Sequence, residues 1–582
     1  MTQKTWDRGT SPASDTLKFT KTLTWNKDSA PASVVEGSTT LNYVYDTAGR
    51  PSQFKNGSTQ LTGWTYTSNT STIATRTDGT ANTNSFGYDW ARRVTSITAT
   101  AGTFSGTGTV SRTYRLDGTL ATQAFPSSIT ETLSYDPVKR PTGISLGVAG
   151  SLSQSFDRAG RVISEGRTLT GISGDAGGGT QSFFYDNLSR LGSSNGPSTT
   201  SRGYQYDLDG NRTQRVQNST TTTNFTYDRA DTAINQTIGA TTRTFTYDRY
   251  GNLTQAPDAN SAYSIYGFDE ANRLTSITPP TGGAVTFTVD PLDRHASRLV
   301  SGSTTDNYGY VGPAETAWQT GATTTTSALL DNDGSRLAVK TGTGGVAWLI
   351  FDLHGSAVAL CTAGTSTVSD AYRYDGYGER IGASGASLNP WQYRGLLNIG
   401  SDSLTWALLD MGARDYAPQL GTFTQWDSVQ GKAANPLSMN RYLYALANPA
   451  TLIDPDGHKA CEMDPCNEGD TAHDYPNGAT PKIVPKHKNT NTSCTTPGCG
   501  KANTGGGGGG GGGAGQDPPF TGLNPWALQA DPTVVDALDR GGDACWRSGL
   551  NDPDCQTYTE LQEWLQANQD LYCNWHRAEC DA

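Results

Sequence analysis

The chain has 582 residues, of which only 34% are hydrophobic and 17% charged, and its formal net charge is −12. This length exceeds what one compact core organises, so several domains or a repeat array are expected. The 68 glycines and the many Thr and Ser residues favour a polar, turn-rich β protein over a helical enzyme. No run approaches the roughly 20 consecutive apolar residues that span a bilayer, so no transmembrane segment is expected.

The N-terminal residues MTQKTWDRGTSPASDTLKF lack the apolar core of a secretion signal. We expect residues 1–39 to form a β extension of the structure that follows. We also expect the chain to be a piece of a longer protein whose native start is missing.

A short phrase with Tyr-Asp at its centre recurs from residue 40 to residue 382, and its clearest copy is FTYDRYGNLTQ at 245–255. From Asp186 to Asp290 its Asp recurs every 20 or 21 residues, and such a fixed period indicates a repeat architecture. The Asp residues of the phrase are Asp46, Asp89, Asp136, Asp157, Asp186, Asp207, Asp228, Asp248, Asp269, Asp290, Asp331, Asp352 and Asp375.

One copy of the phrase predicts a β-hairpin. Phe245 and Tyr247 alternate with Thr246, which is the period of a strand with one aromatic face. Asp248 and Gly251 fit the first and fourth positions of a type I turn. An isolated hairpin cannot bury its aromatic face, so the units should stack into one long, coiling antiparallel sheet in which each Tyr packs against the next. The alternative is that exposed aromatics of the array bind carbohydrate.

The phrases YDxxGR and YDxxGN resemble the YD repeats of the Rhs and YD-repeat family. That family includes interbacterial polymorphic toxins, insecticidal toxin C components, wall-associated proteins and, more distantly, teneurins. The block 383–458 resembles the Rhs-associated core of the family through MGARDYAPQLGTFTQWDS and NRYLYALANPATLIDPDGH. The resemblance implies a mainly β fold: YD-repeat hairpins wound into a spiralling antiparallel sheet, a hollow or partial shell that the core plugs and that encloses the C-terminal segment.

In toxin members of the family the core is an aspartyl autoprotease. Matched motif by motif, the resemblance assigns the catalytic pair to Asp427 in WDSVQG and Asp454 in DPDG. It makes Arg414 in GARDY the orienting group and places the cut at His458–Lys459. Two carboxylates held together cannot both ionise readily, so one keeps a proton and the pair can activate water against a nearby peptide.

This chain departs from the cleaving pattern in three places. Its first motif lacks the proline that cleaving members carry, the two aspartates stand further apart in the sequence, and His458 replaces the usual leucine. The alternative is that 454–457 forms a type I turn that ends the core, with Asp427 as another turn residue.

The composition changes beyond His458. We predict a polar, Cys-containing segment over 459–504, a polyglycine linker over 505–515 and a small α-helical, disulfide-linked domain over 516–582. Eight basic and 17 acidic residues lie in 459–582, and repulsion from phosphates counts against nucleic-acid binding. No motif of an effector enzyme is found there.

Eight of the nine cysteines lie in this C-terminal region. An even set in a Gly- and Pro-rich segment indicates disulfides and an oxidising, extracellular compartment. Zinc is the alternative, because two of the cysteine pairs have a spacing that it accepts. The candidates are Cys461, Cys466, Cys494, Cys499, Cys545, Cys555, Cys573 and Cys580.

These observations favour a secreted or cell-surface shell scaffold that encloses or presents its variable C-terminal region. Its expected partners are that region and a cell-surface, glycan or secretion-machinery component, with no nucleic acid for the scaffold and no cofactor. The first alternative is a polymorphic interbacterial toxin that releases residues 459–582 by autoproteolysis. The second is a carbohydrate-binding surface protein.

Overall fold

A computed structural model of the protein describes residues 2–7, 17–68, 70–197, 201–257, 262–303, 305–311, 314–320, 323–342, 344–385, 389–399, 408–432, 435–458 and 460–462. All of them belong to one compact unit. The predicted polyglycine linker, the helical domain and the cysteines after Cys461 lie outside the described residues. Cys461 itself lies in a short strand, of which only the backbone is described.

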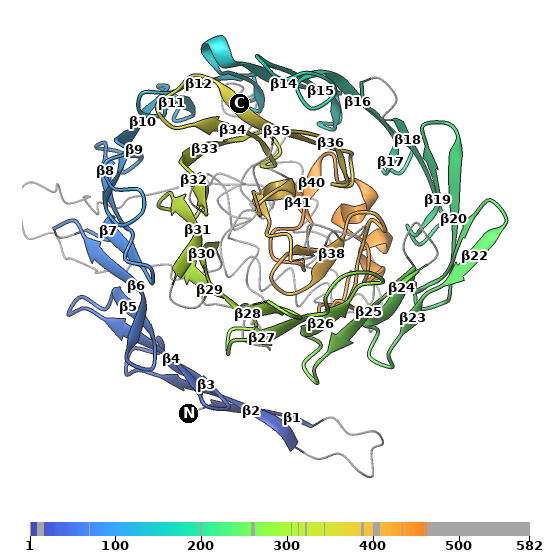
Figure 1. Ribbon diagram of the computed structural model, residues 1–582, viewed down its shortest axis with the longest axis horizontal. Coiled ribbons are helices and arrows are strands. Elements are labelled where there is room, and N and C mark those ends of the chain that lie inside the picture. The colour runs from blue at the N-terminus through green and yellow to red at the C-terminus, as the bar shows by residue number, and fades with distance from the viewer. Residues whose placement is uncertain are drawn as a thin grey trace, which may run out of the picture. The chain divides into compact units, whose positions relative to one another are not determined.

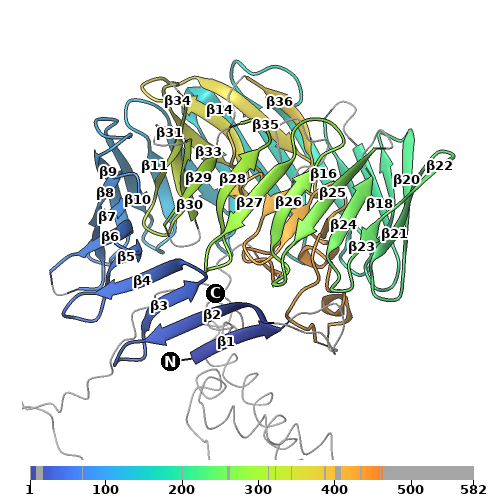
Figure 2. The same ribbon diagram turned by 60° about the horizontal axis from the view of Figure 1, so that its bottom comes forward.

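Two antiparallel sheets of 22 and 14 strands make up this unit. Each strand pairs with the strands before and after it in the sequence, as in β1–β2, β2–β3, β23–β24 and β35–β36. Figure 2 shows β24 to β28 lying side by side in this order. The Phe245 N–H donates to the Ile234 carbonyl at 2.9 Å, so the second sheet follows directly from the first. The predicted mainly β fold, a coiling antiparallel meander, is confirmed.

The strands of the first sheet are β1 (Thr2–Asp7), β2 (Leu17–Trp25), β3 (Pro31–Glu36), β4 (Thr39–Tyr45), β5 (Pro51–Asn56), β6 (Thr59–Tyr66), β7 (Ile73–Asp78), β8 (Thr83–Tyr88), β9 (Val94–Ala101), β10 (Thr109–Tyr114), β11 (Leu120–Ala124), β12 (Thr130–Tyr135), β13 (Pro141–Ser145), β14 (Gly150–Phe156), β15 (Val162–Leu169), β16 (Gly178–Tyr185), β17 (Leu191–Asn195), β18 (Ser201–Tyr206), β19 (Arg212–Gln217), β20 (Thr221–Tyr227), β21 (Ala233–Ile238) and β22 (Thr241–Thr244). A 3-10 turn, η1 (Gly147–Ala149), precedes β14.

The strands of the second sheet are β23 (Thr246–Tyr247), β24 (Leu253–Pro257), β25 (Tyr263–Phe268), β26 (Leu274–Thr278), β27 (Val285–Val289), β28 (His295–Val300), β29 (Asp306–Val311), β30 (Ala314–Thr320), β31 (Thr323–Leu330), β32 (Arg336–Thr341), β33 (Val346–Phe351), β34 (Ala357–Thr362), β35 (Val368–Tyr374) and β36 (Arg380–Ser384). The segment after them contains η2 (Tyr393–Gly395), β37 (Leu409–Asp410), β38 (Asp415–Ala417), β39 (Thr422–Phe423), η3 (Pro436–Met439), η4 (Ala445–Ala447), β40 (Leu452–Ile453) and β41 (Cys461–Glu462).

The Asp of the repeat phrase closes its own turn, as predicted. The Asp46 carboxylate accepts hydrogen bonds from the Ala48 and Arg50 N–H groups at 2.9 Å each. The Gly49 N–H donates to the Asp46 carbonyl at 3.0 Å, and Gly49 has a left-handed φ of 75°. Residues other than Gly and Asn also take this position, such as Lys139 with φ 68°. A left-handed non-Gly residue costs about 1–2 kcal/mol, which the Asp hydrogen bonds help to offset.

The contact between neighbouring units is made by the Arg of the phrase. The Arg50 Nε donates to Asp46 Oδ2 at 2.7 Å, and its guanidinium lies 4.4 Å from the centre of the Tyr66 ring. The Tyr66 hydroxyl in turn donates to the Pro51 carbonyl at 2.6 Å. The same stacking joins Arg93 to Tyr114, Arg140 to Phe156, Arg161 to Tyr185, Arg190 to Tyr206 and Arg294 to Tyr310. We call this set of contacts the Asp–Arg–Tyr clamp.

The clamp corrects the packing expected from the sequence. Each Tyr was expected to pack against the Tyr of the next unit, but its ring stacks on the Arg of the preceding unit. In one unit the hydrogen bond of the Tyr hydroxyl to the preceding unit is made by another side chain. Phe156 has no hydroxyl to reach the Pro141 carbonyl, and the Gln154 side-chain amide donates to that carbonyl instead, at 2.7 Å. A partly buried carbonyl left without a donor costs free energy. The Gln154 amide therefore takes the place of the missing Tyr hydroxyl as the donor to the Pro141 carbonyl.

The second sheet lies inside the arc of the first, and residues 389–399, 408–432 and 435–458 lie inside the second (Figure 1). Buried apolar side chains fill the space between the two sheets, and Phe125, directly after β11 of the outer sheet, packs on Trp348 of the inner one with ring centres 5.1 Å apart. Ion pairs add to this contact, with Lys21 to Asp293 at 2.7 Å. Within the described part of the chain, no helix has the length and apolar character needed to cross a membrane.

The clamp predicts different outcomes for two adjacent arginines. Arg93 holds the Asp89 carboxylate at 2.7 Å and stacks on Tyr114, whereas Arg92 is exposed. Lysine keeps the charge but loses the planar fork and the stacking, so Arg93→Lys should lower the local stability of β8–β10 by about 1 kcal/mol. Hydrogen exchange of that segment measures the loss. Arg92→Lys is the matched control and should leave the exchange unchanged; equal rates in the two variants would contradict the clamp.

Candidate functional site

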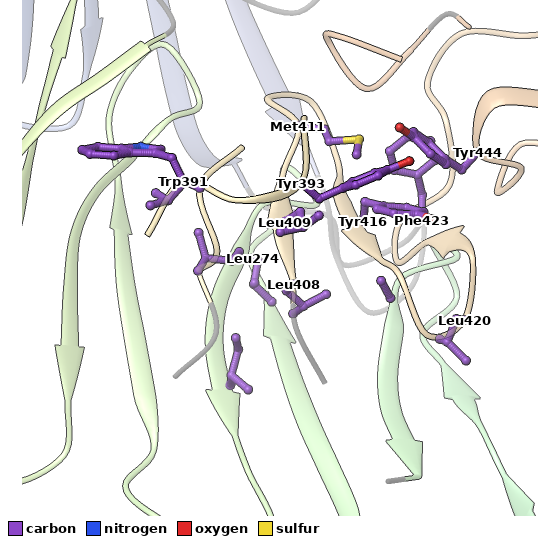
Figure 3. Packing of buried hydrophobic residues seen from close by; sticks show 14 of the residues in the cluster. Leu274, Trp391, Tyr393, Leu408, Leu409, Met411, Tyr416, Leu420, Phe423 and Tyr444 are labelled. Atoms are coloured by element: carbon purple, nitrogen blue, oxygen red, sulfur yellow. The ribbon is translucent and has the colours of Figure 1, made fainter. Parts of the chain in front are cut away.

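The segment after β36 leaves the sheets and contains few regular hydrogen-bonded elements. It is held instead by buried aromatic and aliphatic side chains that pack on the inner sheet, as Figure 3 shows for Leu274, Tyr393 and Leu408. Tyr416 and Tyr444 are fully buried, and their ring centres lie 4.1 Å apart. Aromatic packing of this kind fixes irregular backbone without a sheet ladder. It positions the three motifs that the sequence singled out.

Arg414 connects these motifs through one guanidinium. Its Nη2 lies 2.9 Å from Asp427 Oδ2 and 3.3 Å from Asp454 Oδ2. Its Nη1 donates to the Arg441 carbonyl at 2.8 Å, and its Nε donates to the Gly457 carbonyl. All three charged side chains are buried. Charge-assisted bonds to a planar guanidinium fix direction as well as distance, so the two carboxylates are held in one place.

His458 joins the same cluster. Its Nδ1 lies 2.8 Å from Asp427 Oδ1, and its backbone N–H donates to Asp456 Oδ1 at 3.0 Å. The residue on the amino side of the expected cut therefore touches one of the two predicted catalytic carboxylates. Lys459 lies outside the described residues.

Burial and like charges set the protonation of this pair. Burial raises the pKa of Asp454 to about 6, and the carboxylates of Asp456 and Asp427 act in the same direction against the lowering effect of Arg414. Burial also lowers the pKa of the Arg414 guanidinium, an effect that Asp427 and Asp454 oppose. One guanidinium faces two carboxylates, so a proton on Asp454 balances the charge. Asp454 can thus keep its proton up to a pH of about 6, beside the second carboxylate.

Gly457 is required by the close approach of two turns. It has a left-handed φ of 77°, and a Cβ there would lie 3.0 Å from the Arg414 nitrogen and from the Met411 carbonyl oxygen. The Ala413 N–H donates to the Asp456 carbonyl at 3.1 Å, which fastens the two turns together. The glycine of the DPDG motif therefore lets this turn lie against the backbone of Arg414.

The structure brings Arg414, Asp427 and Asp454 together, as the motif comparison predicted. Asp427 also accepts the Val429 N–H at 2.8 Å, so it serves its own turn as well. The contact from His458 to Asp427 was not predicted. Its only signal in the sequence is the histidine that stands in place of the usual leucine.

Arg394 fastens the core segment to a turn of the inner sheet. It donates to the His354 carbonyl at 2.6 Å and also to the Pro449 carbonyl. Beside it, Glu165 of β15 contacts the His354 ring. The cavity between these residues has a volume of about 20 Å³, which holds a single water molecule. The cluster therefore acts as an anchor and offers no space for a small-molecule substrate.

Comparison with known proteins decides the family. The Teneurin YD-shell model matches residues 127–450, more than half of the chain. The chain belongs to the Teneurin YD-shell family. This YD shell is 25% identical over 265 residues to the tRNA3(Ser)-specific nuclease WapA of Bacillus spizizenii, an alignment that covers 44% of this chain and 11% of that protein. The tRNA nuclease WapA of Bacillus subtilis is 24% identical over 265 residues, with the same coverage.

Solved structures show the same fold. The crystal structure of TcdB2-TccC3 superposes with a TM-score of 0.62 at 16% sequence identity and covers 78% of this chain and 27% of that one. The Tc holotoxin pore of Photorhabdus luminescens gives a TM-score of 0.53 at 15% identity, covering 75% and 27%. The YD shell described here thus spans about a tenth of the WapA proteins and about a quarter of these toxin chains.

The Arg414 cluster predicts a large stability effect with a specific rescue. Arg414→Met leaves two buried carboxylates without their partner, which should destabilise the segment 408–458 by about 3–5 kcal/mol. The triple variant Arg414→Met, Asp427→Asn, Asp454→Asn removes the charges together and should recover part of this loss. Hydrogen exchange of 408–417 and 452–458 measures both. Equal loss in the single and the triple variant would show that Arg414 acts through packing alone.

Proposed function

We propose that this YD shell is an exported or cell-surface scaffold that carries residues 459–582 as its own cargo and releases them by cutting between His458 and Lys459. The observation that carries this proposal is the single Arg414 nitrogen that binds both Asp427 and Asp454. These buried carboxylates lie beside the residue that would precede the cut. In this proposal the shell, the core and the C-terminal region act together, and the folding of the core controls when the His458–Lys459 peptide bond is hydrolysed.

The proposed hydrolysis needs one acid and one base. Asp427 takes a proton from water, whose oxygen bonds to the carbonyl carbon of His458. Asp454 gives its proton to the reacting peptide, the C–N bond breaks, and the Lys459 nitrogen leaves protonated while His458 gains a carboxylate. Arg414 keeps both carboxylates in place throughout.

Cleavage is tested on the full chain by denaturing gel and intact mass. The wild type should yield two products, 1–458 and 459–582. Asp427→Asn or Asp454→Asn should leave the chain intact, because each removes one of the two acid–base groups. Asp186→Asn is the matched control, since it makes the same change in a repeat turn and should not affect the cut. A single full-length wild-type product would refute the proteolytic part of the proposal.

The raised pKa of Asp454 predicts the pH dependence. The proton on Asp454 is lost as the pH rises through about 6, so cleavage should slow above that value by about tenfold per pH unit. The precursor made by in vitro translation can be exchanged rapidly into buffers between about pH 5 and about pH 8 and followed by gel. His458→Leu removes an imidazole that lowers the pKa of Asp454, so the decline should keep its slope and begin at a higher pH. A rate that rises or stays level through pH 6 would assign the acid to another group.

A second candidate is a toxin whose released region harms a target cell. It is favoured by the names of the relatives, two of which are tRNA nucleases. Expression of residues 459–582 in the bacterial cytoplasm and, with a signal peptide, in the periplasm separates the two functions. Growth arrest in either compartment supports a toxin, and unaffected growth in both supports a scaffold whose C-terminal region binds a partner.

A further inference from the structure

A second polar cluster lies where the segment 408–417 meets the inner sheet. It consists of His295 at the start of β28, Asp410 in β37 and Asp415 in β38. One nitrogen or oxygen from each residue lies within 4.8 Å of the others. The side chains of His295 and Asp410 are 9% and 10% exposed, and Asp415 is buried.

We propose that His295, Asp410 and Asp415 bind a divalent transition-metal ion, Zn²⁺ or Mn²⁺, which fastens the core segment to the shell. One imidazole nitrogen with two carboxylates is a donor set that suits these ions. Ca²⁺ and Mg²⁺ prefer oxygen donors alone, so they fit the site less well. No thiolate takes part, which separates this site from a cysteine–zinc site.

The spacing of two of the three donor atoms suits one ion. His295 Nδ1 lies 3.0 Å from Asp410 Oδ2. With bonds of about 2.1 Å, neighbouring ligands around one metal ion lie about 3 Å apart. The two donor atoms are therefore already at the separation that shared coordination requires. Three protein ligands would leave a further position for water.

Both candidate carboxylate ligands are oriented by a second hydrogen bond. Gly412 N–H donates to Asp410 Oδ1 at 2.8 Å, which turns Oδ2 toward His295. The Gln425 amide donates to Asp415 Oδ2 at 2.6 Å. The Gln425 carbonyl oxygen is itself fixed by the Asp415 N–H at 2.8 Å. Outer hydrogen bonds of this kind are the usual support of metal ligands.

The charge of the cluster also favours a dication. Two carboxylates share this buried place with one imidazole, and a protonated imidazole neutralises one of them at most. A divalent ion bound to a neutral imidazole neutralises both, and a buried uncompensated carboxylate is costly. The alternative to a metal ion is a proton on the His295 imidazole. The cluster is then a simple ion pair between His295 and Asp410.

The test compares metal content in folded full-length protein. The wild type and the variants His295→Gln and Asp415→Asn are stripped with a chelator, reloaded with excess Zn²⁺ and dialysed, and bound zinc is counted by mass spectrometry. The wild type should hold one equivalent more than either variant. His354→Gln, which changes another buried histidine that contacts a carboxylate, is the control and should hold as much as the wild type. Equal zinc in wild type and variants would overturn the site.

Co²⁺ spectroscopy distinguishes this site from a site made of cysteine ligands. Because it uses the wild-type chain, its result does not depend on whether the variants fold. Wild-type chain loaded with one equivalent of Co²⁺ should show the visible bands of nitrogen and oxygen coordination without a thiolate charge-transfer band. Chelation should then speed hydrogen exchange in β37 and β38 while the repeat strands β4–β12 keep their rates. A thiolate band at the first equivalent, or exchange that is indifferent to chelation, would place the metal elsewhere and overturn the proposal.

Discussion

The Asp–Arg–Tyr clamp is the interaction on which the shell depends. Each unit is too short and too polar to bury its own strands, so its stability must come from its neighbours. The clamp solves this with three linked contacts: Asp46 holds Arg50, Arg50 covers the Tyr66 ring, and the Tyr66 hydroxyl returns to Pro51. Repetition of these contacts fixes the register of a long meander that has a low apolar content.

Burial divides the two sheets into an outer wall and an inner one. In the outer sheet, strands such as β12 alternate between covered and exposed residues. In the inner sheet, five of the six residues of β34 are buried, because the outer sheet covers one face and the core segment the other. The inner sheet therefore has the near-continuous apolar strands of a sheet covered on both sides.

Burial inside the two sheets determines the properties of the charged residues in the core segment. Asp427 and Asp454 would be ordinary turn carboxylates at a surface, whereas burial around Arg414 raises the pKa of Asp454 to about 6. The contact of His458 with Asp427 brings the residue before the expected cut into the same cluster. The site therefore depends on the scaffold, because the two sheets and the core segment bury Arg414, Asp427 and Asp454, whose charges water would weaken at a surface.

A period of about 21 residues and a Tyr-Asp-x-x-Gly turn act locally, so the repeat, the turn and the strands could be predicted from the sequence alone. Motif resemblance also pointed to Arg414, Asp427 and Asp454. The stacking of Arg50 on Tyr66, the contact of His458 with Asp427 and the choice of repeats that form the inner wall became apparent only in the folded molecule. Those contacts depend on how sheet twist accumulates over many strands, and no single unit contains that information.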